Sequence, residues 1–166
     1  AQLESRSKRQ APRASALRVE ITESMITADP DRSLQTVLAL SALGVHVSID
    51  DFGTGYSSLS MLKRLPVDEL KIDRSFVSPM MHDESDMIIV RSTIHLGHDL
   101  GMKVIGEGVE DQGTLDRLAA LGCDLIQGYH VSRPLPPDAF TEWLIDRLGS
   151  PGHGEGEAGQ PLQAGT

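Results

Sequence analysis

Short apolar or alternating runs take turns along the chain with longer segments of helical period, which predicts that strands and helices follow one another. The strands are expected at 17–22, 45–49, 69–73, 103–106 and 124–126. The helices are expected at 30–43, 58–65, 86–100, 112–121 and 139–148, and Gly44, Gly101 and Gly122 end three of them. Strand and helix alternate five times, so the pattern predicts an α/β fold with parallel strands joined by right-handed crossovers.

Each predicted strand ends in polar or charged side chains. Along the chain these are Glu20, then Asp50 and Asp51, then Lys71 and Asp73, then Glu107, and finally Gln127. Successive groups are 30, 21, 36 and 20 residues apart, which fits one strand–helix unit each. Because the carboxyl ends of parallel strands line the active site of such folds, we expect these side chains to lie along one rim.

Two adjacent carboxylates, Asp50 and Asp51, follow the apolar run 45–49. Like charges this close repel each other, so keeping both ionised calls for a cation or a network of hydrogen-bond donors. A hard divalent ion is one interpretation of the pair. The other is a cap for the helix expected at 58–65, since Asp commonly accepts free amides at helix starts. This stretch alone leaves both open.

Composition and charge limit the class of protein. The 166 residues suffice for one domain but fall short of the roughly 250 of a closed eight-stranded βα barrel. A net charge of −9 argues against a nucleic-acid duplex as partner. No apolar run approaches the ~20 residues of a membrane span, no signal-like segment opens the chain, and Cys123 has no second cysteine to pair with. We expect a cytoplasmic location, and a membrane anchor upstream in a parent protein stays compatible with it.

The two ends of the chain differ from its middle. Residues 1–18 carry a charge of about +4, which leaves about −13 for the rest. Residues 1–16 mix Ser, Pro and basic side chains and are interpreted as a basic linker or truncated leader. Residues 149–166 are rich in Gly and Pro with almost nothing to bury, so we expect a disordered tail. The ordered part is expected at 17–148.

Five blocks in this order resemble a known family. They are Leu-Arg-Val-Glu-Ile-Thr-Glu-Ser at 17–24, Ile-Asp-Asp-Phe-Gly-Thr-Gly-Tyr-Ser-Ser-Leu at 49–59, Leu-Lys-Ile-Asp at 70–73, Glu-Gly-Val-Glu at 107–110 and Gln-Gly-Tyr at 127–129. The chain resembles the EAL-domain phosphodiesterases of bacterial cyclic di-GMP signalling. The resemblance implies that 17–148 is the C-terminal part of an EAL domain, an incomplete TIM-type (βα) barrel with about the last five βα units of eight. It also implies metal-dependent hydrolysis of cyclic di-GMP to linear pGpG.

The same resemblance implies roles for the strand-end residues. Glu20, Asp50 and Asp51 would be metal ligands in a site for two Mg²⁺ or Mn²⁺ ions, with Asp50 bridging them. Lys71 would hold and polarise the attacking water or a phosphate oxygen. Glu107 would act as general base or orient the water. Carboxylates suit these ions, which prefer oxygen ligands, and two metals can serve the hydrolysis of a phosphodiester.

Two further residues take roles by resemblance. Gln127 would bind at the second metal or at a phosphate of the substrate. Glu23 would anchor the loop 50–58, which in the family helps to couple dimer formation to catalysis. The resemblance therefore implies a homodimer formed through this loop region, with cyclic di-GMP as the ligand.

Two family features are missing from the sequence. It contains neither the Glu-Ala-Leu signature nor any Asn, so two ligands of one metal are absent and the two-metal site is incomplete. We therefore expect a truncated fragment that is inactive by itself. One alternative is a non-catalytic module that binds cyclic di-GMP or a protein partner. Another is an enolase-type barrel, which also sets carboxylates and a Lys around Mg²⁺ but does not account for the block at 49–59.

Overall fold

The computed structural model describes residues 13–55 and 59–148. The chain divides after Val131 into two units, and each unit is described by itself. Of the expected leader only 13–16 are described, and they include a short 3-10 helix, Ala14–Ala16. The expected tail at 149–166 lies outside the described residues.

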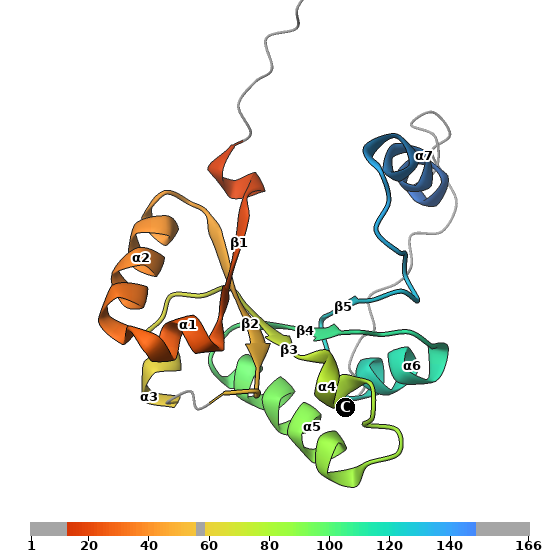
Figure 1. Ribbon diagram of the computed structural model, residues 1–166, viewed down its shortest axis with the longest axis horizontal. Coiled ribbons are helices and arrows are strands. Elements are labelled where there is room, and N and C mark those ends of the chain that lie inside the picture. Colours follow the sequence, from red (N-terminus) through yellow and green to blue (C-terminus); the bar gives the residue numbers. More distant parts are fainter. Residues whose placement is uncertain (1–12, 56–58, 149–166) are drawn as a thin grey trace, which may run out of the picture. The chain divides into compact units, whose positions relative to one another are not determined.

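A five-stranded sheet organises the first unit. Its strands are β1 (Arg18–Thr22), β2 (His46–Phe52), β3 (Glu69–Ile72), β4 (Lys103–Glu107) and β5 (Leu125–Gln127). They lie side by side in chain order, and every neighbouring pair is parallel. Figure 1 shows this order. The prediction of an α/β fold with parallel strands is confirmed.

Helices connect the strands. They are α1 (Glu23–Ala28), α2 (Pro30–Ala42), α3 (Leu59–Leu62), α4 (Arg74–Val77), α5 (Glu84–Asp99) and α6 (Gln112–Ala120), and the second unit contains α7 (Pro137–Leu148). The short helices α1 and α4 were not predicted from the sequence. Among the described residues, none of the helices combines the length and the apolar character needed to cross a membrane.

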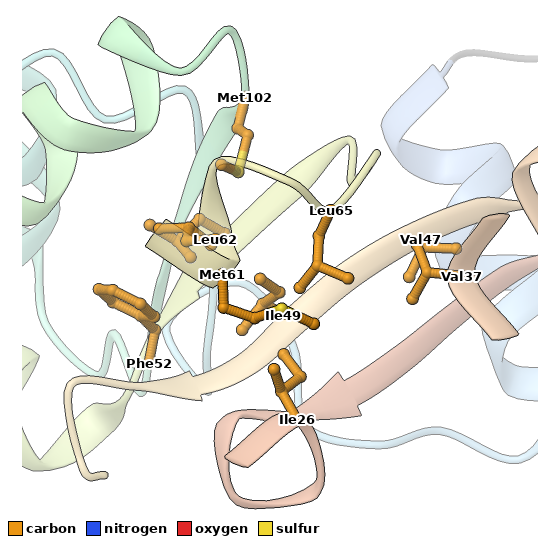
Figure 2. Close-up of a cluster of buried hydrophobic side chains, with 10 residues drawn as sticks. Ile26, Val37, Val47, Ile49, Phe52, Met61, Leu62, Leu65 and Met102 are labelled. Atoms are coloured by element: carbon orange, nitrogen blue, oxygen red, sulfur yellow. The ribbon is translucent and has the colours of Figure 1, made fainter. Parts of the chain in front are cut away.

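One face of the sheet carries the apolar core. Two clusters of buried side chains, one around β2 and the other around β3 and β4, join the strands to the helices. In the first, Ile49 of β2 packs with Ile26 of α1 and with Met61 and Leu62 of α3, as Figure 2 shows. In the second, Val104 of β4 packs with residues of α5 and α6. The helices therefore cover this face.

The charged side chains of the strands lie on the other face of the sheet. Residues two apart on a strand share a face, so Glu20, Asp50, Lys71 and Glu107 lie opposite the apolar clusters. Each of these side chains sits at or near the carboxyl end of its strand. The sheet thus separates a core that holds the helices from a charged surface at one end of the strands.

Aspartates at the opposite end of the sheet fasten neighbouring strands together. Asp68, just before β3, accepts the N–H of Val47 at 2.9 Å, and Asp124, just before β5, accepts the N–H of Val104 at 2.8 Å. The Nε2 atom of His98 also lies 2.8 Å from Asp124. Burial raises the pKa of Asp124, but the hydrogen bonds from Val104 and His98 outweigh it and lower the pKa below its ordinary value.

We predict that Asp124→Asn lowers the free energy of unfolding near neutral pH. Asn keeps an acceptor for Val104 but loses the charge that strengthens both hydrogen bonds. Because the carboxylate is 35% exposed, solvent screening limits the loss to about 1 kcal/mol. The carboxyl's pKa is lowered by folding, so its contribution is present above the ordinary value of 3.8 and disappears as pH falls through the lowered value.

Urea unfolding of the wild-type chain and of Asp124→Asn, between pH 7 and pH 3, measures the difference in their free energies of unfolding. Asp99→Asn, which alters an exposed carboxylate at the end of α5, is the control. A loss equal to that of the control at pH 7, or one that grows on acidification, contradicts the prediction.

Candidate functional site

Lys71 lies at the centre of the charged face. Its Nζ atom is 2.9 Å from Glu20 Oε1, 2.9 Å from Asp50 Oδ1 and 2.7 Å from Glu107 Oε1. These carboxylates come from β1, β2 and β4, so three different strands direct a negative charge to the lysine on β3. Three carboxylates therefore surround one ammonium group, each with an oxygen within 3 Å of Nζ.

The lysine is almost completely buried, with 3% of its surface exposed. Burial lowers the pKa of Lys71, but the hydrogen bonds to Glu107, Asp50 and Glu20 outweigh this effect and raise the pKa above its ordinary value. The side chain is therefore a permanent positive charge. It offsets part of the repulsion among the carboxylates.

An irregularity in β2 brings two consecutive carboxylates to the same side. The pairing of β2 with β3 shifts register between Ile49 and Phe52. Asp51 within this stretch has a φ of 55°, in the left-handed region that Asp tolerates better than most residues. On a regular strand Asp50 and Asp51 would point to opposite faces. The strand was expected to stop at position 49, but it continues through both aspartates to Phe52.

Carboxylate oxygens of Asp50, Asp51 and Glu107 lie within 4.8 Å of one another. Burial, followed by the charges of Asp50 and Asp73, raises the pKa of Asp51. Burial also raises the pKa of Glu107, despite the opposing effect of Lys71. With Glu20, four carboxylates lie near a single ammonium group, so Lys71 does not balance their negative charge. A set of oxygen donors with this excess charge fits a hard divalent cation.

The remaining strand-end residues lie beside this cluster. Glu20 directs its carboxylate to Lys71 and is not one of the three clustered groups. Gln127 ends β5 and is paired in register with Glu107. Gln127 and Glu107 line a cavity of about 190 Å³. Glu110, from the loop after β4, and Arg74 of α4 also line it. The structure thus places Gln127 next to the carboxylates, on the β5 side.

Glu23 fastens the loop that follows β2. Its side chain, 2% exposed, accepts the backbone N–H groups of Gly53 at 2.9 Å and of Gly55 at 3.0 Å. Both hydrogen bonds end on the same carboxylate oxygen and connect the start of α1 to this loop. Residues 56–58 of the loop lie outside the described part of the chain, so the homodimer through 50–58 stays a prediction.

Sequence reasoning missed one ion pair on the same face. Arg18 Nη2 lies 3.0 Å from Glu69 Oε1, so this ion pair joins β1 to β3 across β2. On each strand it lies two residues before the pair of Glu20 and Lys71. The signs are reversed: β1 carries Arg then Glu, whereas β3 carries Glu then Lys. This alternation at positions two apart is visible in the sequence and could have identified the pair.

The geometry agrees with what comparison with known proteins finds. The family model for the EAL domain matches residues 1–134. The chain belongs to the EAL domain family. It is 49% identical over 124 residues to the bifunctional diguanylate cyclase/cyclic di-GMP phosphodiesterase MucR of Pseudomonas aeruginosa, and the match covers 75% of this chain and 18% of that protein. The EAL chain therefore spans less than a fifth of that relative's length.

Two solved structures show the same fold. A PaMucR phosphodiesterase in complex with c-di-GMP superimposes with a TM-score of 0.75 at 48% identity, over 77% of this chain and 52% of that one. A manganese and c-di-GMP complex of Klebsiella pneumoniae BlrP1 gives a TM-score of 0.69 at 35% identity, over 74% of this chain and 31% of that one. The prediction of an incomplete TIM-type barrel in an EAL chain is confirmed.

We predict that Lys71→Met destabilises the EAL chain strongly. The substitution leaves Glu20, Asp50 and Glu107 without their shared positive charge, and breaking a buried ion pair typically costs about 3 kcal/mol or more. The loss should be smaller in the presence of Mn²⁺, because a bound cation would offset the repulsion among the carboxylates.

Chemical unfolding with and without Mn²⁺ measures this effect. Lys103→Met, which removes an exposed lysine from β4, serves as the matched control. If both variants lose equal stability, the charge of Lys71 does not hold the carboxylates together.

Proposed function

We propose that this EAL chain contributes to a site that hydrolyses cyclic di-GMP to linear pGpG with the help of divalent metal ions. The observation that carries the proposal is the cluster of Asp50, Asp51 and Glu107 around Lys71 at the carboxyl end of the sheet. The complexes with c-di-GMP and manganese among its relatives support both the substrate and the kind of metal. Oxygen donors of this kind suit Mg²⁺ and Mn²⁺.

Asp50 and Asp51 would hold the metals, with Glu20 as a further ligand on the β1 side. When bound, such ions polarise a phosphate and lower the pKa of a coordinated water. Glu107 lies in the same cluster and has a raised pKa, so its carboxylate is suited to orient the attacking water and to take up its proton.

Lys71 would stabilise charge that develops on the phosphate. Its ammonium group lies between the carboxylates, and its positive charge would act on the non-bridging oxygens of a phosphate bound beside the cluster. Gln127, beside Glu107 on the next strand, would donate its amide N–H to the same phosphate group. Attack by water forms a bond between the water oxygen and phosphorus and breaks the bond to the 3′ oxygen. The 3′ oxygen takes up a proton and becomes a hydroxyl, so the cyclic dinucleotide opens to linear pGpG.

We expect no hydrolysis of cyclic di-GMP by this sequence alone. The family's Glu-Ala-Leu signature and its Asn-bearing strand end, which the resemblance assigns to a metal, do not occur in the sequence. Without the ligands from these two motifs, a metal ion bound to the carboxylates of this chain would lack part of its coordination shell. A module that binds cyclic di-GMP without turnover is the second candidate, because the lysine and the three clustered carboxylates remain.

The test is cyclic di-GMP hydrolysis in Mn²⁺ by this chain alone and after mixing with the three N-terminal strands of an EAL domain. We predict no pGpG from the chain alone and measurable pGpG from the mixture. Asp50→Ala should abolish that activity, whereas Asp31→Ala, on the exposed start of α2, should not change it.

Each outcome separates the candidates. Turnover by the chain alone would show that the missing Glu and Asn are dispensable. If the mixture produces no pGpG but binds cyclic di-GMP, the second candidate, a module that binds the dinucleotide without turnover, is favoured. Silence without binding of Mn²⁺ or the dinucleotide would contradict the proposed function.

A further inference from the structure

The short helix α4 contacts the loops that follow two other strands. It directly follows β3, and its first turn is closed by Asp73, whose side chain accepts the N–H of Ser75 at 2.9 Å. Its last residue, Val77, is completely buried in the apolar cluster around β3 and β4. The helix is thus fastened at both ends, and it can act as a rigid support for what packs on it.

Phe76 supports the loop after β2. Gly53 in this loop has a φ of 101°, and a Cβ built on it would lie 2.9 Å from Cε2 of the Phe76 ring. The ring therefore packs directly on the backbone of Gly53. The N–H of this glycine donates a hydrogen bond to Glu23. The loop is therefore fixed, two residues after Asp51, by the Phe76 ring and by the carboxylate of Glu23.

Arg74 supports the loop after β4 in the same way. Gly108 has a φ of 70°, and a Cβ there would lie 2.5 Å from the Cβ of Arg74. Gly108 directly follows Glu107. One four-residue helix therefore contacts the backbone beside Asp51 and the backbone beside Glu107, with glycine at each contact and no side chain between.

We propose that α4 is a wedge that sets the separation between Asp51 and Glu107, with Phe76 and Arg74 as its positioning residues. The inference deepens the proposed function, because this spacing matters for chemistry only if the two carboxylates share a cation or a water. Metal ligands must be placed within a few tenths of an ångström, and residues that orient them typically change affinity by about tenfold or more when altered.

Amide resonances of the full, metal-free chain test the wedge by NMR. Gly108→Ala should push Arg74 and move α4, so that the resonances of Gly53 and Gly55 shift although they lie in another loop. Gly44→Ala is the matched control. Gly44 has a φ of 76° and nothing within 4 Å of its Cβ position, so the variant shares the backbone strain without the contact.

A rescue variant distinguishes α4 from a direct route through the carboxylates. Adding Arg74→Gly to Gly108→Ala removes the Cβ that collides, so the resonances of Gly53 and Gly55 should return toward wild type. If the shift persists in the double variant, the route does not pass through α4. Mn²⁺ affinity should fall about tenfold in Gly108→Ala and recover in the double variant.

The reciprocal variant covers the case in which Gly108→Ala does not fold. Phe76→Ala should shift the amide of Gly108, and Phe76→Leu should shift it less. The proposal is overturned if Gly108 stays unmoved in Phe76→Ala, or if Gly53 and Gly55 stay unmoved in a folded Gly108→Ala. Because the resonances are read without metal, a wild-type chain that binds no Mn²⁺ contradicts the proposed function and leaves the wedge to be judged separately by these shifts.

Discussion

The ammonium group of Lys71, held by three carboxylates, is the interaction on which the charged face depends. Glu20, Asp50 and Glu107 reach it from three strands, at 2.9, 2.9 and 2.7 Å. This arrangement requires β1 to β4 to be parallel, adjacent and in register, since a slip by one residue would turn each side chain to the other face. The same contacts keep mutually repelling carboxylates close enough to serve one site.

One face of the sheet packs against the helices, and the other carries the charged residues of the candidate site. Apolar residues such as Ile49 and Val104 bind the helices to one face, so the other face is free to carry charge. On that face Arg18 of β1 pairs with Glu69 of β3, two residues before the pair of Glu20 and Lys71 on each strand. In the first pair β1 supplies the positive charge, and in the second it supplies the negative charge. These two pairs tie β1 to β3 across β2, which fixes the strands whose ends bear the site.

Much of the fold followed from the sequence, because strands and long helices have clear periods and each strand ends in a polar residue. The helices α1 and α4 were missed, since segments of 6 and 4 residues are too short to show a period. The extension of β2 through Asp51 was also missed, because its φ of 55° and the register shift depend on contacts with β3 and Glu23. Local pattern carries no information about such tertiary contacts.

The central claim is that Asp50 and Asp51 hold a divalent cation beside the carboxylate of Glu107. Anomalous diffraction from crystals of the EAL chain soaked in Mn²⁺ tests it most directly. The account predicts a manganese peak within coordination distance, roughly 2 to 2.6 Å, of an oxygen from Asp50 and of one from Asp51, at the cluster that they form with Glu107. A map with no peak at this cluster, or with manganese bound only elsewhere while Lys71 keeps its three carboxylate partners, would contradict it.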